Sequence, residues 1–166
     1  AACAERIQAV LDTAPAITDG PGGATPEGHA VQFRNVSFAY PGAEAPVLDG
    51  VSFTAVPGTV TAVIGATGSG KTTLLNLLPR FLAATGGTIS IGGCDVRSLP
   101  LDALRSLIAV VPQHSYLFSG TLAENLRIAA PSATDEDLWR VLGSAQAEEF
   151  VRKLPLGLEA PVNQGG

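Results

Sequence analysis

A phosphate-binding loop is the pattern in this chain that most clearly predicts chemistry. The spacing G-x-x-x-x-G-K-S/T is met by Gly65, Gly70, Lys71 and Thr72. The apolar run VTAVI precedes the loop and LLNLL follows it, which predicts a strand before the loop and a helix after it. A glycine-rich turn between strand and helix is the plain alternative, but such a turn needs no lysine, and the only lysines here are Lys71 and Lys153. The pattern therefore predicts nucleotide binding.

The residue types of this loop suit a triphosphate. Glycine has no Cβ, so backbone N–H groups can approach several phosphate oxygens. Lys71 would add a full positive charge for the β- and γ-phosphates, and the Thr72 hydroxyl is placed to ligate Mg²⁺. The following helix would add the partial positive charge of its N-terminus. We expect the phosphates to be held by Gly65, Ala66, Thr67, Gly68, Ser69, Gly70, Lys71, Thr72 and Thr73.

Length and composition limit the class of protein. A chain of 166 residues fits one domain with a real core. A formal net charge of −5 without any run of Lys or Arg argues against a nucleic-acid partner. Cys3 and Cys94 lack C-x-x-C spacing, and His29 and His114 lack a second ligand at metal spacing. No apolar run is long enough to span a bilayer, and the first residues do not resemble a signal peptide.

The sequence predicts a series of elements on both sides of the phosphate loop, up to about residue 112. Residues 5–11 have helical spacing, and the Gly- and Pro-rich stretch that follows to residue 30 predicts a flexible linker. Residues 31–40 predict strand with a bend or bulge near Arg34 and Asn35, because the apolar alternation shifts there. Further strands are predicted at residues 47–56, 59–65, 88–93 and 108–112, and helices at residues 74–82 and 101–107.

The pattern becomes helical beyond about residue 119. Within residues 132–144, Thr134 is placed as an N-cap with Asp137 three positions on. Helices are also predicted at residues 121–129 and 147–154. The expected fold class is α/β, with a phosphate-loop core, an antiparallel strand subdomain over about residues 31–53, and the beginning of an α-helical subdomain.

Taken in order, these segments resemble the nucleotide-binding domain of an ATP-binding cassette (ABC) transporter of the exporter type. VSFAYPG resembles the loop whose aromatic residue, here Tyr40, stacks on adenine. The unit VLDGVSFTAVPGTVTAVIGATGSGKTTLLNLL is similar to the family almost throughout. VVPQHSYLFSGTLAENL resembles the exporter Q-loop region, with Gln113 as the glutamine that contacts Mg²⁺ or water. ERIQAVLDTAPAI resembles the connector that follows the last transmembrane helix.

The resemblance implies a domain plan and roles. Residues 1–30 would be the connector and linker, and residues 31–166 a partial P-loop NTPase domain with its Q-loop near residue 113. Lys71 and Gln113 would be catalytic, Thr72 and Gln113 would ligate Mg²⁺, and Tyr40 with the phosphate loop would bind ATP. The implied partners are a transmembrane domain and a second nucleotide-binding domain. Together they would enclose two ATP molecules at the cytoplasmic face of the inner membrane and couple hydrolysis to transport.

The family's later motifs do not occur in these 166 residues. They are the S-G-G-Q signature, the Walker B strand with its Mg²⁺-binding Asp and catalytic Glu, and the switch His. The order of Gln164-Gly165-Gly166 differs from the signature. The resemblance therefore implies an N-terminal portion that stops before the signature, and we expect it to bind nucleotide without turnover.

Other interpretations remain open at this stage. Tyr40 is also compatible with an aromatic at a strand end, and Gln113 with a polar loop residue. The alternatives for the whole protein are a soluble ABC ATPase without a membrane partner, a nucleotide-binding module without turnover, and, less well supported, a P-loop kinase. LFSGTLAENL and the connector segment favour the exporter.

Overall fold

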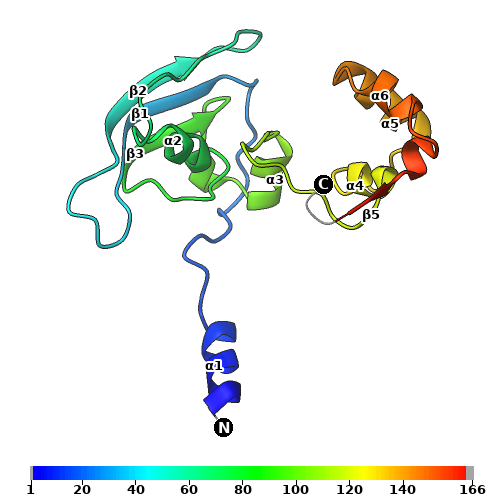
Figure 1. Cartoon of the computed structure of the whole chain (residues 1–166). Coiled ribbons are helices and arrows are strands. Elements are labelled where there is room, and N and C mark those ends of the chain that lie inside the picture. Colours follow the sequence, from blue (N-terminus) through cyan, green and yellow to red (C-terminus); the bar gives the residue numbers. More distant parts are fainter. Residues whose placement is uncertain (1, 164–166) are drawn as a thin grey trace. The chain divides into compact units, whose positions relative to one another are not determined.

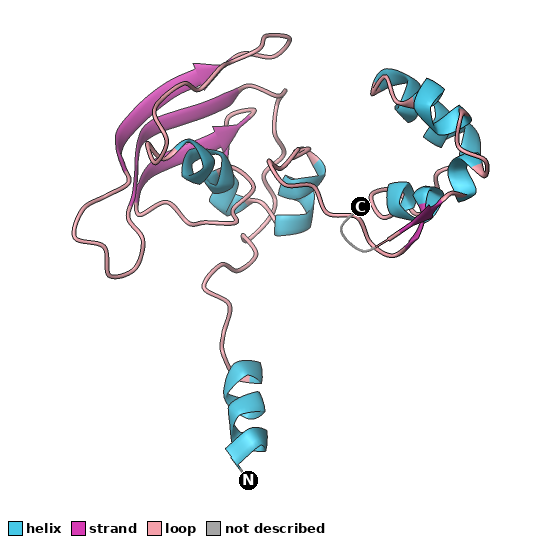
Figure 2. Cartoon of the chain, in the orientation of Figure 1, coloured by secondary structure: helices cyan, strands magenta, loops and turns pink. Residues whose placement is uncertain are grey.

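The computed structural model describes residues 2–163, which form two compact units (Figure 1). The first unit ends at Ala109 and the second begins at Val110. Figure 2 shows that the strands and helices of the first unit are mixed, whereas the second unit is mainly helical. This mixed α/β content matches the expected fold class. The comparison of Gln164-Gly165-Gly166 with the signature falls outside the described residues.

An antiparallel sheet of four strands, in the order β2-β1-β3-β4, organises the first unit. The bend expected near Asn35 is confirmed, because the pairing of β1 with β2 shifts register between Phe33 and Val36. Asn35 itself has a φ of 50°, in the left-handed region that Asn tolerates better than most residues. The strands are β1 (Val31–Phe38), β2 (Leu48–Ala55), β3 (Gly86–Ile91) and β4 (Cys94–Asp95).

The core of the first unit lies between this sheet and helix α2 (Lys71–Leu77). Leu74 and Leu77 of the helix are buried together with Phe33, Val36 and Phe38 of β1. A regular strand buries every second residue, so burial at 33, 36 and 38 records the extra residue of the bulge. The 3₁₀ turn η1 (Val96–Ser98) and helix α3 (Leu101–Ser106) complete this core.

A second core holds the helical unit together. Its buried members are Ala123, Leu138, Leu142, Val151 and Leu158. They come from helices α4 (Leu122–Arg127), α5 (Asp135–Ser144) and α6 (Glu148–Arg152) and the 3₁₀ turn η2 (Gly157–Glu159). The two-stranded pairing of β5 (Gly120–Thr121) with β6 (Pro161–Val162) brings the beginning and end of this unit together.

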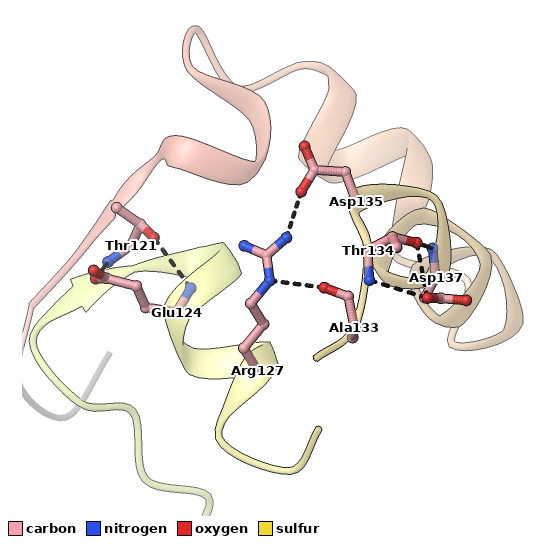
Figure 3. A network of polar contacts seen from close by, with 7 residues as sticks. All are labelled: Thr121, Glu124, Arg127, Ala133, Thr134, Asp135 and Asp137. Atoms are coloured by element: carbon pink, nitrogen blue, oxygen red, sulfur yellow. Dashed lines mark hydrogen bonds and ion pairs between the residues drawn. The ribbon is translucent and has the colours of Figure 1, made fainter. Parts of the chain in front are cut away.

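Capping boxes fix where α4 and α5 begin (Figure 3). The Thr134 hydroxyl accepts from the Asp137 N–H, and the Asp137 carboxylate accepts from the Thr134 N–H, which confirms the predicted cap. Thr121 and Glu124 form the same box on α4. Between the two helices, the Arg127 guanidinium donates to the Ala133 carbonyl at 2.9 Å and pairs with Asp135 (Figure 3). These contacts set the turn that joins α4 to α5.

Two predicted strands are not formed. Residues 59–65 and 108–112 carry neither helix nor strand in the structure. Val60 is 97% exposed and Ile64 90% exposed, although both belong to a run with the character of a buried strand. Such a run needs neighbours on both faces and both edges to become a strand. The four-stranded sheet of the described residues pairs neither segment, so apolar composition alone was an insufficient guide.

The N-terminal region combines a helix with an ordered segment. Helix α1 (Ala2–Leu11) matches the predicted helical spacing. The following residues to Ala30 carry no helix or strand, as expected of a linker. The backbone of this segment nevertheless makes hydrogen bonds to residues 92–99 of the core, so it differs from a freely flexible linker. None of the helices in the described part of the chain is long and apolar enough to cross a bilayer.

Candidate nucleotide-binding site

Backbone conformation and close packing shape the predicted phosphate loop, which leads into α2 at Lys71. Gly68 and Gly70 have φ values of 82° and 88°, which favour glycine over any residue with a Cβ. A Cβ on Gly70 would also lie 3.0 Å from Val47 Cγ1 and 2.9 Å from Leu48 Cδ2. A Cβ on Gly68 would meet nothing within 4 Å. Gly70 is therefore required both for its backbone conformation and for close packing, whereas Gly68 is required for its conformation alone.

The Lys71 ammonium group is held by the loop itself. Its Nζ donates to the carbonyl oxygens of Gly65 at 2.8 Å and Ala66 at 2.7 Å, and Ser69 Oγ lies 3.5 Å away. The Ser69 N–H closes the turn by donating to the Ala66 carbonyl at 3.2 Å. Ionised phosphate oxygens are stronger acceptors than neutral carbonyls. An incoming phosphate therefore competes for Nζ at a position that the loop already defines.

Tyr40 lies at the other end of the same site. Its hydroxyl is 3.2 Å from the hydroxyl of Thr73, which is 7% exposed. The edge of one ring meets the face of the other between Tyr40 and Phe38, with ring centres 4.8 Å apart. Tyr40 is still 44% exposed, so part of the ring is open to a planar ligand. The structure thus joins the predicted base-stacking residue to the predicted phosphate loop.

An open cavity of about 260 Å³ connects these groups. Its lining consists of Tyr40, Val47 and residues 68–73, so aromatic, apolar and phosphate-binding groups share one space. Val47 is the member that the sequence did not single out, because a valine before a strand carries no chemical signal. Its N–H donates to the Phe38 carbonyl at 2.8 Å, which fixes it beside the strand that leads to Tyr40.

The exposed hydroxyl of Thr72 fits a magnesium ion that arrives with phosphate. Thr72 lies in the first turn of α2, beside Lys71. Mg²⁺ commonly takes one or two protein oxygens and completes its shell with phosphate oxygens and water. Within residues 2–163, no group of three or more His, Cys, Asp or Glu side chains could hold a metal by itself. The donor set suits a nucleotide-bound metal rather than a permanent one.

Gln113 belongs to the second unit, whereas Tyr40 and the phosphate loop belong to the first. It is exposed, in a segment without helix or strand. Its predicted role toward Mg²⁺ stays a prediction. Ala66 and Thr67 lie in the exposed part of the loop, and their predicted contact with phosphate through backbone N–H groups stays a prediction.

Comparisons with known proteins identify the family to which this chain is similar. The family model "ABC transporter" matches residues 48–162. An uncharacterized ABC transporter ATP-binding protein of Mycobacterium tuberculosis is 43% identical over 99% of this chain and 29% of its own length. A multidrug efflux ATP-binding/permease protein of the same species is 42% identical over 98% of this chain and 14% of its own length.

A solved structure shows the same fold. A bacterial Atm1-family ABC exporter with ATP bound has a TM-score of 0.91 and 29% identity over 98% of this chain and 28% of its own. This chain thus spans less than a third of the length of these relatives. The family match covers the phosphate loop and most of both units. The chain belongs to the ABC transporter family.

Proposed function

We propose that this chain is the ATP-binding portion of an ABC exporter, in which binding and hydrolysis of ATP drive transport across a membrane. The observation that carries the proposal is the single cavity in which Tyr40, Lys71 and Thr73 meet. An aromatic face, a cation and a glycine-rich backbone are the three groups that a base with a triphosphate tail requires. Permease and exporter proteins among the relatives support the transport setting.

The residues of the first unit have distinct roles in this proposal. Tyr40 stacks on the base through its ring face, which favours purines without reading their hydrogen-bonding edges. Lys71 exchanges its carbonyl partners for oxygens of the β- and γ-phosphates. The backbone N–H groups of residues 65–73 surround the phosphates, with Thr73 nearer the α-phosphate. When bound, Mg²⁺ neutralises phosphate charge, and Thr72 together with Gln113 would hold it.

The proposed domain plan and partners follow from this role. Residues 1–30 connect to a transmembrane domain, and residues 31–166 form part of the nucleotide-binding domain at the cytoplasmic face. A second nucleotide-binding domain would enclose the ATP from the other side, and the residue that orients the attacking water would come from outside this cavity, whose lining has no Asp, Glu or His in the described residues. Gln113 acts in catalysis only within that assembly.

Calorimetric titration of this chain with Mg-ATP tests the proposal. Lys71→Ala removes a charge-assisted contact to phosphate worth about 1.5–3 kcal/mol, so we expect the affinity to fall roughly tenfold to a hundredfold. Lys153→Ala is the matched control, because it removes the only other lysine, which is exposed and paired with Glu149. Its affinity should equal that of the unmodified chain. Equal binding by both variants contradicts the nucleotide assignment.

A further inference from the structure

The segment between α1 and β1 docks on the first unit as a strap, which we define as residues 17–27. Backbone N–H groups of the strap donate hydrogen bonds to carbonyl groups of residues 92–99, and donors later in the strap pair with acceptors earlier in that segment. The Gly20 N–H donates to the Leu99 carbonyl at 3.2 Å, and the Gly22 N–H to the Ser98 carbonyl at 3.1 Å. Further along, the Glu27 N–H donates to Gly92 at 2.9 Å. A chain that merely spans two domains has no need of such pairing.

Gly20 permits the closest approach. A Cβ at this position would lie 2.5 Å from the Arg97 carbonyl oxygen and 2.7 Å from that of Leu99. Backbone atoms cannot move aside as the end of a side chain can. The φ of Gly20 is outside the left-handed region, so the glycine is required here for close packing and not for its conformation. Gly20→Ala is therefore a purely steric probe of docking.

Asp19 caps helix α3, which is distant from it in the sequence. Its Oδ1 accepts from the Leu101 N–H at 2.8 Å, across 82 residues of chain. Helix α3 begins at Leu101 and is preceded by Pro100, whose side chain has no acceptor to cap it. The strap therefore supplies the cap that the local sequence lacks. Along the chain, α3 leads to the segment that contains Gln113.

Arg80 attaches the strap to the other end of the nucleotide site's helix. It lies three residues beyond the end of α2, and its Nη2 donates to the Thr18 carbonyl at 3.0 Å. Burial of Asp95 opposes its ionisation, but hydrogen bonds from Arg97 and the charges of Arg97 and Arg80 hold the pKa of Asp95 below its usual value. The charge of Arg80 thus acts on Asp95 as well as lying beside the strap.

Arg80, whose Nη2 donates to the strap, also has an unfavourable feature. Arg80 Nη1 is buried without a hydrogen-bond partner among residues 2–163. A buried N–H without a partner raises the free energy of the state that buries it. A ligand that binds this unit more tightly when the strap is docked would shift the balance between docked and released strap.

We propose that the strap senses occupancy of the nucleotide site, with Asp19 and Arg80 as positioning residues. This inference rests on the proposed ATP site. Helix α2 begins at Lys71 in the phosphate loop, and its trailing residue Arg80 holds the strap, so nucleotide bound to the loop favours docking through one short helix. By thermodynamic linkage, docking strengthens nucleotide binding by the same factor. Residues 12–16 join the strap to α1. A change in the docking of the strap would therefore be passed to the N-terminal part of the connector.

Amide hydrogen exchange of this chain, with and without Mg-ATP, tests the inference. We expect Mg-ATP to slow exchange at Gly20 and Gly22 by about fivefold or more, within the usual range of coupling between sites. Asp19→Ala and Gly20→Ala should abolish this slowing and weaken Mg-ATP binding by the same factor. Asp19→Asn keeps an acceptor oxygen and should behave as the unmodified chain. Glu27→Ala is the matched control, because it removes an exposed carboxylate from the same strap.

The outcomes separate the two proposals. If Mg-ATP binds but strap exchange is unchanged, the sensing role is wrong and the proposed function stands. If Asp19→Ala retains the full response to Mg-ATP, the capping contact plays no part and the inference is overturned. If the unmodified chain does not bind Mg-ATP at all, the proposed function is wrong and the sensing role with it. A merely structural strap would change basal exchange in the variants without any dependence on nucleotide.

Discussion

The hydroxyls of Tyr40 and Thr73 lie 3.2 Å apart, so the ring that is expected to receive the base is bonded to the last residue of the phosphate loop. The two residues are separated by 33 positions in the sequence, and nothing in either motif requires the contact. Its consequence is that the angle of the ring and the position of the loop depend on each other. Phe38 also contacts the ring, edge to face, with an interplanar angle of 85°.

Thr73→Val is expected to weaken ATP binding by up to about tenfold, because it keeps the side-chain shape but removes the hydrogen bond, worth ~0.5–1.5 kcal/mol, that holds the Tyr40 ring in position for the base. Tyr40→Phe removes the same bond from the other partner and should cost a similar amount. The double variant should cost no more than the larger single effect, since both changes delete one interaction. Calorimetric dissociation constants for the four proteins decide this, and strictly additive losses would refute the contact.

Tyr40→Ala tests stacking separately from the hydrogen bond. Loss of an aromatic platform costs about 1–3 kcal/mol per base, or roughly fivefold to more than a hundredfold in affinity. GTP and ATP should lose affinity to a similar degree, because a ring face does not read the edge of the base. Competition titration with both nucleotides measures the two losses. A loss confined to one nucleotide would show edge recognition instead.

Gly70→Ala should destabilise the first unit more than Gly68→Ala does. Both substitutions place a Cβ in the left-handed region, at a cost of about 1–2 kcal/mol. Only at Gly70 does the new atom also meet Val47 and Leu48, which adds about 1–3 kcal/mol of overpacking. Urea unfolding of the two variants isolates the packing contribution as their difference. Equal midpoints would mean that the loop does not pack on the start of β2.

Steady-state phosphate release from this chain with Mg-ATP should stay well below the ~1 s⁻¹ low end of typical enzymes. The lining of the cavity offers Lys71 and two threonines in the described residues, but no carboxylate or imidazole to orient water. Lys71→Ala serves as the control for contaminating ATPases. Turnover that disappears in that variant would reveal a catalytic base elsewhere in the chain.

Acid should loosen the start of α5. Hydrogen bonds from the Thr134 side chain and backbone, aided by Arg140, hold the pKa of Asp137 below its usual 3.8. A lowered folded-state pKa means that the stabilisation is present above pH 3.8 and is lost as the pH falls through the folded value. Asp137→Asn should reduce this dependence, whereas Glu136→Gln removes a charge from the same turn and leaves the capping box intact. Unfolding midpoints between pH 2 and 6 compare them; a Glu136→Gln effect as large as that of Asp137→Asn would contradict this account.

Local signals in the sequence predicted local structure well. The shift of alternation at Asn35 and the Thr134–Asp137 cap are both present, because each depends on residues only a few positions apart. The strand predicted at residues 59–65 is wrong for the opposite reason, since a buried strand exists only when distant segments pair with it. The cap from Asp19 to Leu101 has no sequence signal either, because its partners are 82 positions apart in the chain.

The candidate site shows the same division. The loop from Gly65 to Thr73 was predicted from spacing alone, because phosphate chemistry dictates those residue types. Tyr40 was predicted only through resemblance to a family, and Val47, which lines the same cavity, was not predicted at all. The sequence places no constraint that would identify a valine as part of a cavity wall, whereas the folded chain places it against Gly70.

Residues 59–65, which include Val60 and Ile64 and pair with no strand of the described residues, also affect how the protein behaves in solution. Val60 is 97% exposed and Ile64 90% exposed. Burying either side chain against another surface would lower the free energy by about 1.5–3 kcal/mol. A net charge of −5 makes two copies of the chain repel each other and so opposes contact between these segments. Salt shortens the reach of that repulsion to about 10 Å at 0.1 M. Colloidal stability of this chain should therefore decline as ionic strength rises, with light scattering increasing well before any loss of helix.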